Sequence, residues 1–405
     1  MGLTPGFKQT EIGVVPQDWG VTPLGRLISS VEYGSSAKSN KEGRTPVLRM
    51  GNLQGGKIDW NDLVFTDDES EIRKYSLIPG DVLFNRTNTI DLVGKTALYK
   101  GERAAIFAGY LIRVKADNAL LHSGFLNYVL NSEFSKKHSA KILSVAVGQA
   151  NINGQKLKSY PIPCPPTRAE QETIAEALSD VDALLESVEK LIVKKRDLKQ
   201  GAMQELLTGK KRLPGFRATW EMKRLGEICQ IAMGRTPPRL NPEYWGSGHT
   251  WLSIGDLQAK LVSESKEEIT ALAAADMKAI PKGTLLMSFK LSIGRLCFAG
   301  CDLYTNEAIC SFNDLRAIPD FLYYALGRTK FALYGKQAVK GYTLNSESLR
   351  LIEVCLPSND EQTAIATILS DMDAEIAALE TKLIKVREFK QGMMQALLTG
   401  RTRLA

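Results

Sequence analysis

The sequence predicts an α+β protein in which two globular domains of mixed helix and strand are joined by two long helices that form an antiparallel coiled coil. Three observations lead to this fold class. The chain repeats itself at an offset of 191 residues (Glu170 to Glu361), each repeat ends in a helix with heptad spacing, and short strand-like segments precede each helix. The chain is therefore expected to be a tandem repeat with pseudo-twofold symmetry.

The repeat is clearest near the end of each half of the chain. Lys199–Gly209 has the sequence KQGAMQELLTG, and Lys390–Gly400 has KQGMMQALLTG. The match continues without a gap back to Glu170 and Glu361, with about half of the positions identical, which unrelated helices would not give. The repeat predicts four segments: a globular domain at 1–160, a helical region at 161–213, a globular domain at 214–355 and a helical region at 356–405.

Each helical region carries an apolar seam with alternating spacings of four and three. The first seam is Ile174, Leu178, Val181, Leu185, Val188 and Ile192, and the second is Ile365, Leu369, Met372, Ile376, Leu379, Leu383 and Val386. This heptad pattern favours two helices paired with each other over two surface helices that each cover their own domain. Roughly 38 residues of helix would make a rod of about 57 Å.

The ends and the direction of these helices follow from particular residues. Thr167 and Ser358 follow Pro-containing stretches and suit an N-cap, and each helix is expected to close at a glycine, Gly209 or Gly400. Lys199 and Lys390 fall in the seams near the C-terminal ends. A parallel pair would place the two lysines side by side, whereas an antiparallel pair brings each lysine near an Asp of the other helix, so we expect antiparallel helices.

The globular parts contain short strand signals between turns. DVLF (81–84), KTALY (95–99), YLIRV (110–114) and TLLMSF (284–289) are typical strands among Gly, Pro and Asn, and FLNYVLNSEF (125–134) and FLYYALGRTKFALY (321–334) are typical helices. Each globular part is therefore expected to be an α+β domain of about 150 residues.

Composition places the chain among ordinary globular proteins. Of its 405 residues 44% are hydrophobic and 24% are charged, and the net charge of +7 favours an acidic partner. The sequence contains no apolar run long enough for a bilayer and no secretory pattern at its N-terminus, so we expect a cytoplasmic protein. The six cysteines are scattered without a paired C-x-x-C, which predicts core residues and no metal site.

No active site is evident in the sequence. There is no G-x-G-x-x-G motif and no Walker loop, and the three histidines are not spaced as metal ligands, so we predict a non-catalytic chain without a cofactor of its own. Asn241–Tyr244 (NPEY) is similar to the Asn-Pro-Pro-aromatic loop of amino-methyltransferases. Glu243 replaces the second proline and no glycine-rich cofactor loop precedes it, so we interpret this segment as a turn.

Both globular parts contain loops that combine Gly with Arg, Lys, Asn, Gln, Ser and Thr. Lysine and arginine neutralise phosphates, while Arg can read guanine and Asn or Gln can read adenine in the major groove. Such loops occur at matching positions in the two repeats, which indicates DNA binding. The predicted contacts are Arg44, Arg86, Asn88, Lys95, Gln149, Asn151 and Asn153 in the first repeat, and Arg235, Thr236, Arg239, Lys290, Arg295, Lys340, Tyr342, Thr343 and Asn345 in the second.

With these motifs the sequence resembles the specificity subunit of Type I restriction-modification enzymes. The resemblance rests on MGRTPPRLNPEYWGSGHTWLSIGDLQ (233–258), on the Pro-rich stretches that lead into EQ…IA…L…D.D, and on KQG.MQ.LLTG at the end of each helix. It spans nearly the whole chain. The first repeat departs from the pattern by lacking the Pro-Glu-Tyr-Trp element, and TNEA (305–308) has Glu307 where Gln is common in the family.

The resemblance implies that each globular domain is a target recognition domain for one half of a split, asymmetric DNA sequence. It also implies that the helices set the length of the unread gap and dock two methyltransferase subunits. These partners would bring S-adenosylmethionine, and restriction (motor-nuclease) subunits would bring ATP and Mg²⁺, whereas this chain would hold no cofactor. A rod of about 57 Å is long enough to hold two readers one turn of DNA, about 34 Å, or more apart.

Two other function classes are compatible with parts of the sequence. A self-contained DNA methyltransferase would explain the NPEY segment, although the cofactor loop is missing. A coiled-coil scaffold with two protein-binding domains would explain the repeat, although it would not need basic loops at matching positions. A complex that only methylates DNA, without a nuclease subunit, is also compatible with the sequence.

Overall fold

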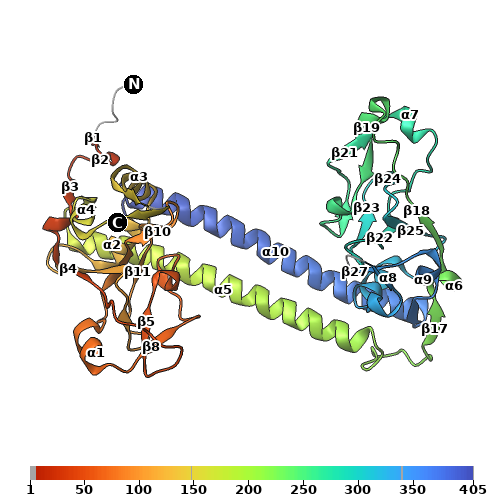
Figure 1. Ribbon diagram of the computed structural model, residues 1–405, viewed down its shortest axis with the longest axis horizontal. Helices are drawn as coiled ribbons and strands as arrows, with labels where there is room; N and C mark the ends of the chain where they lie inside the picture. The colour runs from red at the N-terminus through yellow and green to blue at the C-terminus, as the bar shows by residue number, and fades with distance from the viewer. Residues whose placement is uncertain (1–5, 147, 339–340, 405) are drawn as a thin grey trace. The chain divides into compact units, whose positions relative to one another are not determined.

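A computed structural model of the chain describes residues 6–146, 148–338 and 341–404, with the backbone alone described at 146, 336–338 and 341–343 (Figure 1). The chain divides into two compact units, each of which is built from segments distant in sequence. Unit 1 comprises Met1–Glu189 together with Thr381–Ala405, and unit 2 comprises Lys190–Glu380. Each unit therefore contains one globular part and portions of both long helices.

Unit 1 contains several small sheets and four short helices ahead of the first long helix. Its main sheet has the order β11-β9-β13-β4, and a second sheet has the order β12-β5-β8. A third small sheet has the order β10-β15-β14, and β1 with β2, β3 with β16, and β6 with β7 form two-stranded pairs. The strands are β1 Phe7–Thr10, β2 Gly13–Pro16, β3 Gly20–Pro23, β4 Ile28–Tyr33, β5 Thr45–Leu48, β6 Leu53–Gln54, β7 Lys57–Ile58, β8 Val64–Thr66, β9 Val82–Asn85, β10 Thr87–Asn88, β11 Thr96–Leu98, β12 Ile106–Phe107, β13 Leu111–Ala116, β14 Ser144–Ala146, β15 Gln149–Asn151 and β16 Pro161–Cys164. The short helices are α1 Glu69–Tyr75, α2 Ser123–Leu130, α3 Glu133–Ile142 and α4 Gly154–Lys158.

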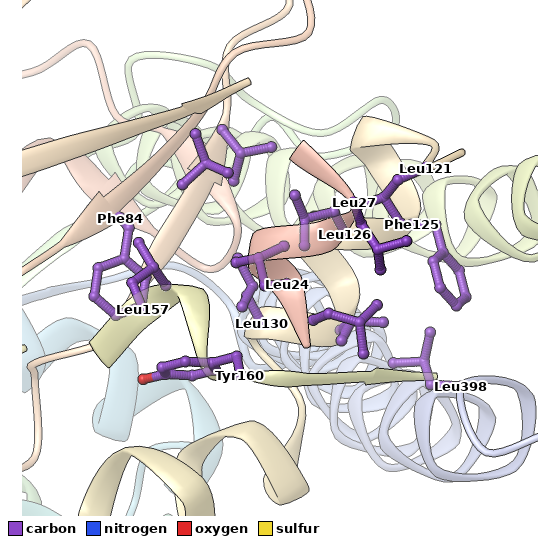
Figure 2. Close-up of a cluster of buried hydrophobic side chains, with 14 of the residues drawn as sticks. Leu24, Leu27, Phe84, Leu121, Phe125, Leu126, Leu130, Leu157, Tyr160 and Leu398 are labelled. Atoms are coloured by element: carbon purple, nitrogen blue, oxygen red, sulfur yellow. The ribbon is translucent and has the colours of Figure 1, made fainter. Parts of the chain in front are cut away.

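The main core of unit 1 joins its globular part to both long helices. Leu24, Phe125 and Tyr160 are completely buried in this cluster, which also contains Leu178 of the first long helix and Leu398 beyond the end of the second. Figure 2 shows several of these side chains, including Leu398 beside the residues of the globular part. The C-terminal segment is thus part of the core of unit 1.

Unit 2 repeats this plan with different strand lengths. Its main sheet has the order β18-β25-β22-β23-β20, and a second sheet has the order β21-β19-β24. The pair β17 and β28 corresponds to β3 and β16 of unit 1, and β26 with β27 forms a hairpin. The strands are β17 Glu221–Arg224, β18 Gln230–Met233, β19 Trp245–Leu252, β20 Leu261–Val262, β21 Glu267–Ile269, β22 Leu285–Ser288, β23 Leu296–Ala299, β24 Tyr304–Thr305, β25 Ile309–Asn313, β26 Lys336–Ala338, β27 Gly341–Thr343 and β28 Glu353–Leu356. The short helices are α6 Leu225–Ile228, α7 Ala271–Ala274, α8 Pro319–Gly327 and α9 Ser346–Arg350.

The main core of unit 2 has matching members. Leu225, Phe321 and Ile352 are completely buried together with Leu369 of the second long helix, and the cluster also contains Leu206 at the end of the first long helix and Leu207 just beyond it. The strand signals in the sequence correspond to β9, β11, β13 and β22. The helix signal at 125–134 is divided between α2 and the start of α3, and that at 321–334 covers most of α8 and a 3-10 turn at Phe331–Leu333. The predicted mixed α+β fold is confirmed.

The two long helices are α5 Arg168–Leu206 and α10 Asn359–Leu397, each of 39 residues. Thr167 immediately precedes α5, and its Oγ1 accepts a hydrogen bond from the backbone N of Glu170 at 3.2 Å. Gly209 and Gly400 follow the two helices with φ of +67° each, the left-handed conformation that ends helices. Both ends of each helix therefore lie where the capping residues indicate.

Within each unit, taken by itself, α5 and α10 run antiparallel. In unit 1, Lys390 pairs with Asp182 at 2.6 Å and Arg387 pairs with Glu189 at 2.6 Å, so the residue number rises along one helix as it falls along the other. In unit 2, Lys199 pairs with Asp373, and Arg196 with Glu380 at 2.5 Å, in the same sense. The predicted antiparallel pairing, with a lysine of each seam beside an Asp of the other helix, is confirmed.

The seam residues are the more buried positions of both helices. In α5, Ile174, Leu178, Val181, Val188 and Ile192 are buried and Leu185 is half-buried. In α10, Ile365, Leu369 and Ile376 are buried, and Met372, Leu379 and Leu383 are half-buried. The burial follows the four-and-three spacing, as expected when one apolar stripe of each helix faces the rest of its unit.

Candidate nucleic-acid interface

Tyr33, the last residue of β4, contacts two other segments of unit 1 that carry predicted DNA contacts. The guanidinium Cζ of Arg86 lies 4.8 Å from the centroid of the Tyr33 ring. The backbone N of Gly154 donates a hydrogen bond to the Tyr33 hydroxyl at 2.8 Å, although the two residues lie far apart in sequence. Tyr33 thus fixes the loop after β9 and the start of α4 in one place.

The small sheet β10-β15-β14 continues this surface with amide side chains. Asn88 of β10 lies opposite Ala150 of β15, and Thr87 lies opposite Asn151, whose Nδ2 donates to the Thr87 hydroxyl at 2.7 Å. Gln149 is exposed, and Asn88 and Asn151 are half-buried. Amides carry both a donor and an acceptor, the combination that reads an adenine edge.

The other residues predicted in unit 1 have local partners. Lys95 Nζ donates to Gln54 Oε1 at 3.2 Å, and Asn153 caps α4 by accepting a hydrogen bond from the backbone N of Lys156 at 2.9 Å. Arg44 precedes β5, where its side chain lies 3.4 Å from Asp67 and 2.5 Å from Glu69. The structure thus brings Arg86, Asn88, Gln149, Asn151 and Asn153 together, while Arg44 lies beside the two carboxylates near α1.

In unit 2 the loop after β18 crosses directly over the segment that follows β24. The backbone N of Gly234 donates to Ile309 O at 3.1 Å, and that of Arg235 donates to Thr305 O at 2.8 Å. A Cβ on Gly234 would lie 2.1 Å from Thr305 Oγ1, so this crossing requires glycine. The crossing places Thr236 beside Glu307, and the Thr236 hydroxyl donates a hydrogen bond to the Glu307 carboxylate.

Arg239 is held against two tryptophans in the same loop. Its Cζ lies 4.0 Å from the Trp245 ring centroid and 4.9 Å from that of Trp251, and its Nη1 donates to Glu267 at 2.7 Å. These cation–π contacts orient the guanidinium, and about half of the Arg239 side chain stays exposed. NPEY, whose Pro242–Tyr244 forms a single 3-10 turn, leads into β19, as the turn interpretation expected.

The Glu307 carboxylate accepts a hydrogen bond from Thr236 and has two cations in its vicinity. The hydrogen bond from Thr236 lowers its pKa, and the nearby Lys290 and Arg239 lower the pKa further, so the side chain is ionised at neutral pH. Lys290 lies 5.4 Å over the Phe289 ring, and Arg295 Nη1 donates to Ile254 O at 3.4 Å. Asn345 caps α9 through the backbone N of Ser348 at 2.8 Å. Lys340 lies outside the described residues, and Tyr342 and Thr343 are described only as backbone of β27.

The two units build these surfaces on equivalent backbone positions. Arg86 N donates to Tyr110 O at 3.1 Å, and Phe289 N donates to Ala308 O at 2.9 Å. Ile152 N donates to Arg86 O, and Leu344 N donates to Phe289 O in the same way, so Arg86 corresponds to Phe289. Lys95 corresponds to Arg295 by the same comparison. Asn85 N donates to Lys95 O in unit 1, and Ser288 N donates to Arg295 O in unit 2.

Sequence reasoning did not single out two residues of these surfaces. Tyr33 orders the surface of unit 1 but is one of many tyrosines in the sequence, and only its long-range partners reveal its position. Glu307 appears in the sequence as a departure at TNEA (305–308), and its proximity to Thr236 becomes visible only where β24 passes under the loop.

No metal centre is evident in the part of the chain that is described. At 6–146, 148–338 and 341–404 no group of three or more His, Cys, Asp or Glu is placed to hold a metal ion. All six cysteines are free thiols, and burial raises the pKa of Cys229 and Cys297 to about 12. Cys297 and Cys310 are buried as predicted for core residues, whereas the other four are only half-buried. Among the helices that the structure describes, none has the length and apolar character needed to cross a membrane.

Comparison with known proteins gives a consistent result for both halves of the chain. Residues 16–194 and 217–388 each match the model of the Type I restriction modification DNA specificity domain. The putative type I restriction enzyme MjaX specificity subunit of Methanocaldococcus jannaschii is 29% identical over 422 residues, which cover 98% of this chain and 97% of that protein.

Two solved structures share the fold. The S subunit of a Type I restriction-modification system from M. genitalium superposes with a TM-score of 0.60 and 16% identity, over 98% of each chain. A chain from a study of complex assembly and conformational transition of the type I R-M system also gives 0.60, with 18% identity over 96% of this chain and 99% of that one. At these identities the likeness concerns the fold.

Proposed function

Because this chain belongs to the family of Type I restriction-modification DNA specificity subunits, we propose that its two globular domains each read one half of a split, asymmetric DNA target. A specificity subunit of this family is non-catalytic and binds no cofactor itself. We assign the two reading functions to the target recognition domains at 1–160 and 214–355, and the helical regions at 161–213 and 356–405 to assembly.

The observation that carries this proposal is the contrast between repeated and unrepeated contacts. Lys390–Asp182 in unit 1 and Lys199–Asp373 in unit 2 are equivalent residues at the offset of the sequence repeat, as are Arg387–Glu189 and Arg196–Glu380. The interface loops, by contrast, share several anchoring backbone hydrogen bonds but carry different side chains. Equal helices suit one kind of partner bound twice, and unequal loops suit two different DNA sequences.

The candidate interface residues divide by chemistry. Lysines are proposed to neutralise phosphates, as Lys95 and Lys290 would, which gives affinity without sequence information. Arginines and amides are proposed to read base edges, as Arg86, Asn88 and Gln149 would in unit 1. The remaining residues of the predicted set keep the same assignments, with Asn153 and Asn345 also serving as helix caps.

The helices are proposed to fix the spacing between the two readers and to dock the partner subunits. The partners are double-stranded DNA, two methyltransferase subunits and, in a complex that restricts DNA, two restriction subunits. S-adenosylmethionine would enter with the methyltransferase subunits, and ATP and Mg²⁺ with the restriction subunits. Such a complex acts on DNA in the cytoplasm, which is the location we propose for this chain.

Selection from a random duplex library tests the proposal. The chain, assembled with its methyltransferase subunits, is expected to enrich a motif with two short defined halves and an undefined gap of fixed length. Enrichment of a single contiguous motif, or of none, would contradict the proposal and favour the scaffold. The purified chain alone, incubated with labelled S-adenosylmethionine and DNA, is expected to transfer no methyl group. Transfer would instead show a self-contained methyltransferase.

A further inference from the structure

The side chains at and beside one backbone position offer opposite hydrogen-bonding chemistry in the two units. The strand that follows it begins at Leu111 in unit 1 and at Ile309 in unit 2, and these residues accept equivalent hydrogen bonds from Gly34 and Gly234. Counting back from these strands, Gly109 of unit 1 corresponds to Glu307 of unit 2. The equivalence of Tyr110 O and Ala308 O as acceptors fixes this alignment independently.

In unit 1 this position is Gly109, which has no side chain, and the guanidinium of Arg86 lies beside it. Arg86 Nη1 donates to the Gly109 carbonyl at 3.5 Å, and the Arg86 guanidinium lies over the Tyr33 ring. Arginine offers only donors, in a planar fork that matches the O6 and N7 acceptors of guanine. The tyrosine ring keeps the fork in one orientation, which lowers the entropy lost when it contacts a base.

In unit 2 the same position presents an acceptor. Glu307 is exposed, and one of its carboxylate oxygens accepts a hydrogen bond from the Thr236 hydroxyl. Because a carboxylate can accept several hydrogen bonds, the exposed group can also accept one from a ligand. An ionised carboxylate has acceptor capacity only. Thr236 fixes its position through a short loop, in which Gly234 N donates to Ile309 O and Arg235 N donates to Thr305 O.

A carboxylate on a surface for DNA needs a specific reason. It repels phosphates, and an unneeded negative charge there would weaken binding to every sequence. In the major groove, however, a carboxylate matches the exocyclic amino group of cytosine, which offers donors and no acceptor. Lys290 and Arg239 lie close enough to Glu307 to act on its charge, and as cations they offset its repulsion of the backbone.

We propose that Glu307 is a specificity-determining residue that reads the amino group of a cytosine in the half-site of unit 2, while Arg86, which lies beside the equivalent Gly109, reads a guanine in the half-site of unit 1. This inference rests on the proposed function, because it concerns the DNA target of the same surface. It names the chemistry of one base in each half: a donor from cytosine in one and acceptors from guanine in the other.

The test compares duplex selections by the assembled complex carrying the wild-type chain, Glu307→Gln or Arg86→Gln. The wild type is expected to prefer cytosine by about tenfold or more at one position of one half-site. Glu307→Gln is expected to lose this preference and to gain adenine there, because an amide pairs with adenine N6 and N7. The other half-site stays unchanged. Arg86→Gln is expected to change a guanine in that other half-site and to leave the cytosine intact.

Glu267→Gln is the matched control. It removes one negative charge from the same unit, beside Arg239, without touching the Thr236–Glu307 pair. Because Glu267 holds Arg239, itself a predicted base contact, this variant is expected to change binding and at most the base that Arg239 contacts, while the cytosine preference stays intact. If Glu307→Gln behaves like Glu267→Gln, or if the wild type selects no cytosine in either half-site, the role of Glu307 is wrong while the split target stands. Absence of a split motif with the wild type would instead contradict the proposed function itself.

Discussion

The ends of the two long helices make the same cluster in units 1 and 2, with different bonding inside it. In unit 2, Arg212 binds Glu361 through two hydrogen bonds of 2.7 Å, and Trp220 Nε1 donates to the same carboxylate at 3.2 Å. In unit 1, Arg403 binds Glu170 through bonds of 2.7 and 2.8 Å and uses its third nitrogen for Asp18 at 2.7 Å. One scaffold thus tolerates two local solutions.

The two units also differ in whether the tryptophan of the cluster makes a hydrogen bond. Trp19, equivalent to Trp220, is completely buried, and its Nε1 has no hydrogen-bond partner among the described residues. Glu361 is fully buried, whereas 11% of the Glu170 side chain is exposed. In unit 2 the buried Glu361 therefore accepts hydrogen bonds from both Arg212 and Trp220. In unit 1 Arg403 instead divides its hydrogen bonds between Glu170 and Asp18, which are more exposed. Matched substitutions can show which features of the repeat matter energetically.

The largest effect is expected from the apolar seam. Leu178 and Leu369 are equivalent, and both are completely buried. Leu178→Ala and Leu369→Ala should each lower the free energy of unfolding of their own unit by about 3 kcal/mol, through lost burial and the cavity that remains. Native-state hydrogen exchange, followed separately for the amides of each unit, measures both values. Losses that differ by more than about half would show that the two seams are energetically unlike.

A smaller and unequal effect is expected from the buried carboxylates. Glu361→Gln should lower the free energy of unfolding of unit 2 by about 2 kcal/mol, because it removes the charge that accepts three hydrogen bonds in a buried site. Glu170→Gln should cost unit 1 about 1 kcal/mol, because its site is partly solvated and Asp18 still pairs with Arg403. Urea unfolding of the two variants gives the comparison. Equal losses would mean that the difference in burial has no energetic weight.

These helices could be predicted in detail because their signals are local and long. Four-and-three spacing over a whole helix, a glycine after its last turn and a lysine within each seam all lie within one segment, and together they determined length, end and direction. Lys199 and Lys390 were decisive, because only an antiparallel pair places them beside Asp373 and Asp182.

The interface was less predictable because it depends on contacts between distant segments. Gly154 N donates a hydrogen bond to the Tyr33 hydroxyl, and no periodic pattern in the sequence predicts this contact. Polar loop residues also have several uses, and sequence does not distinguish them: Asn153 and Asn345 suit base reading but cap helices, and Arg44 suits a phosphate but lies beside Asp67 and Glu69. Which of these side chains also contact DNA stays a prediction.

High pH should separate the cores of the two units at one position. Tyr160 of unit 1 and Ile352 of unit 2 are equivalent, since their carbonyls accept from Leu24 and Leu225. Burial raises the pKa of Tyr160 from 10.0 to about 12. A raised pKa means that stability is fully present below pH 10 and is lost as the pH rises toward 12. Unit 1 should therefore lose up to about 2 kcal/mol in this range.

Tyr160→Phe is the control for this pH dependence. It removes the ionisable hydroxyl and its 2.6 Å hydrogen bond to Ser139, which should cost about 1 kcal/mol at neutral pH. Above pH 10 the variant should lose less stability than the wild type, so the two urea unfolding curves should converge. Parallel losses in both proteins would assign the alkaline transition to other groups.

The smallest effect is expected from the outer ion pairs of the helices. Arg387 with Glu189 and Arg196 with Glu380 are equivalent, and all four side chains are more than two-fifths exposed. Solvent and salt screen such pairs, so Arg387→Ala and Arg196→Ala should each change the free energy of unfolding by less than about 0.5 kcal/mol, and by less still in high salt. Their repetition in both units then reflects selection for the direction and register of the helices, because like charges would meet in a parallel or shifted pair. A loss well above 1 kcal/mol in one unit only would instead show that the ion pair of that unit is a local stabilising contact. The presence of the equivalent pair in the other unit would then not be explained by helix direction and register.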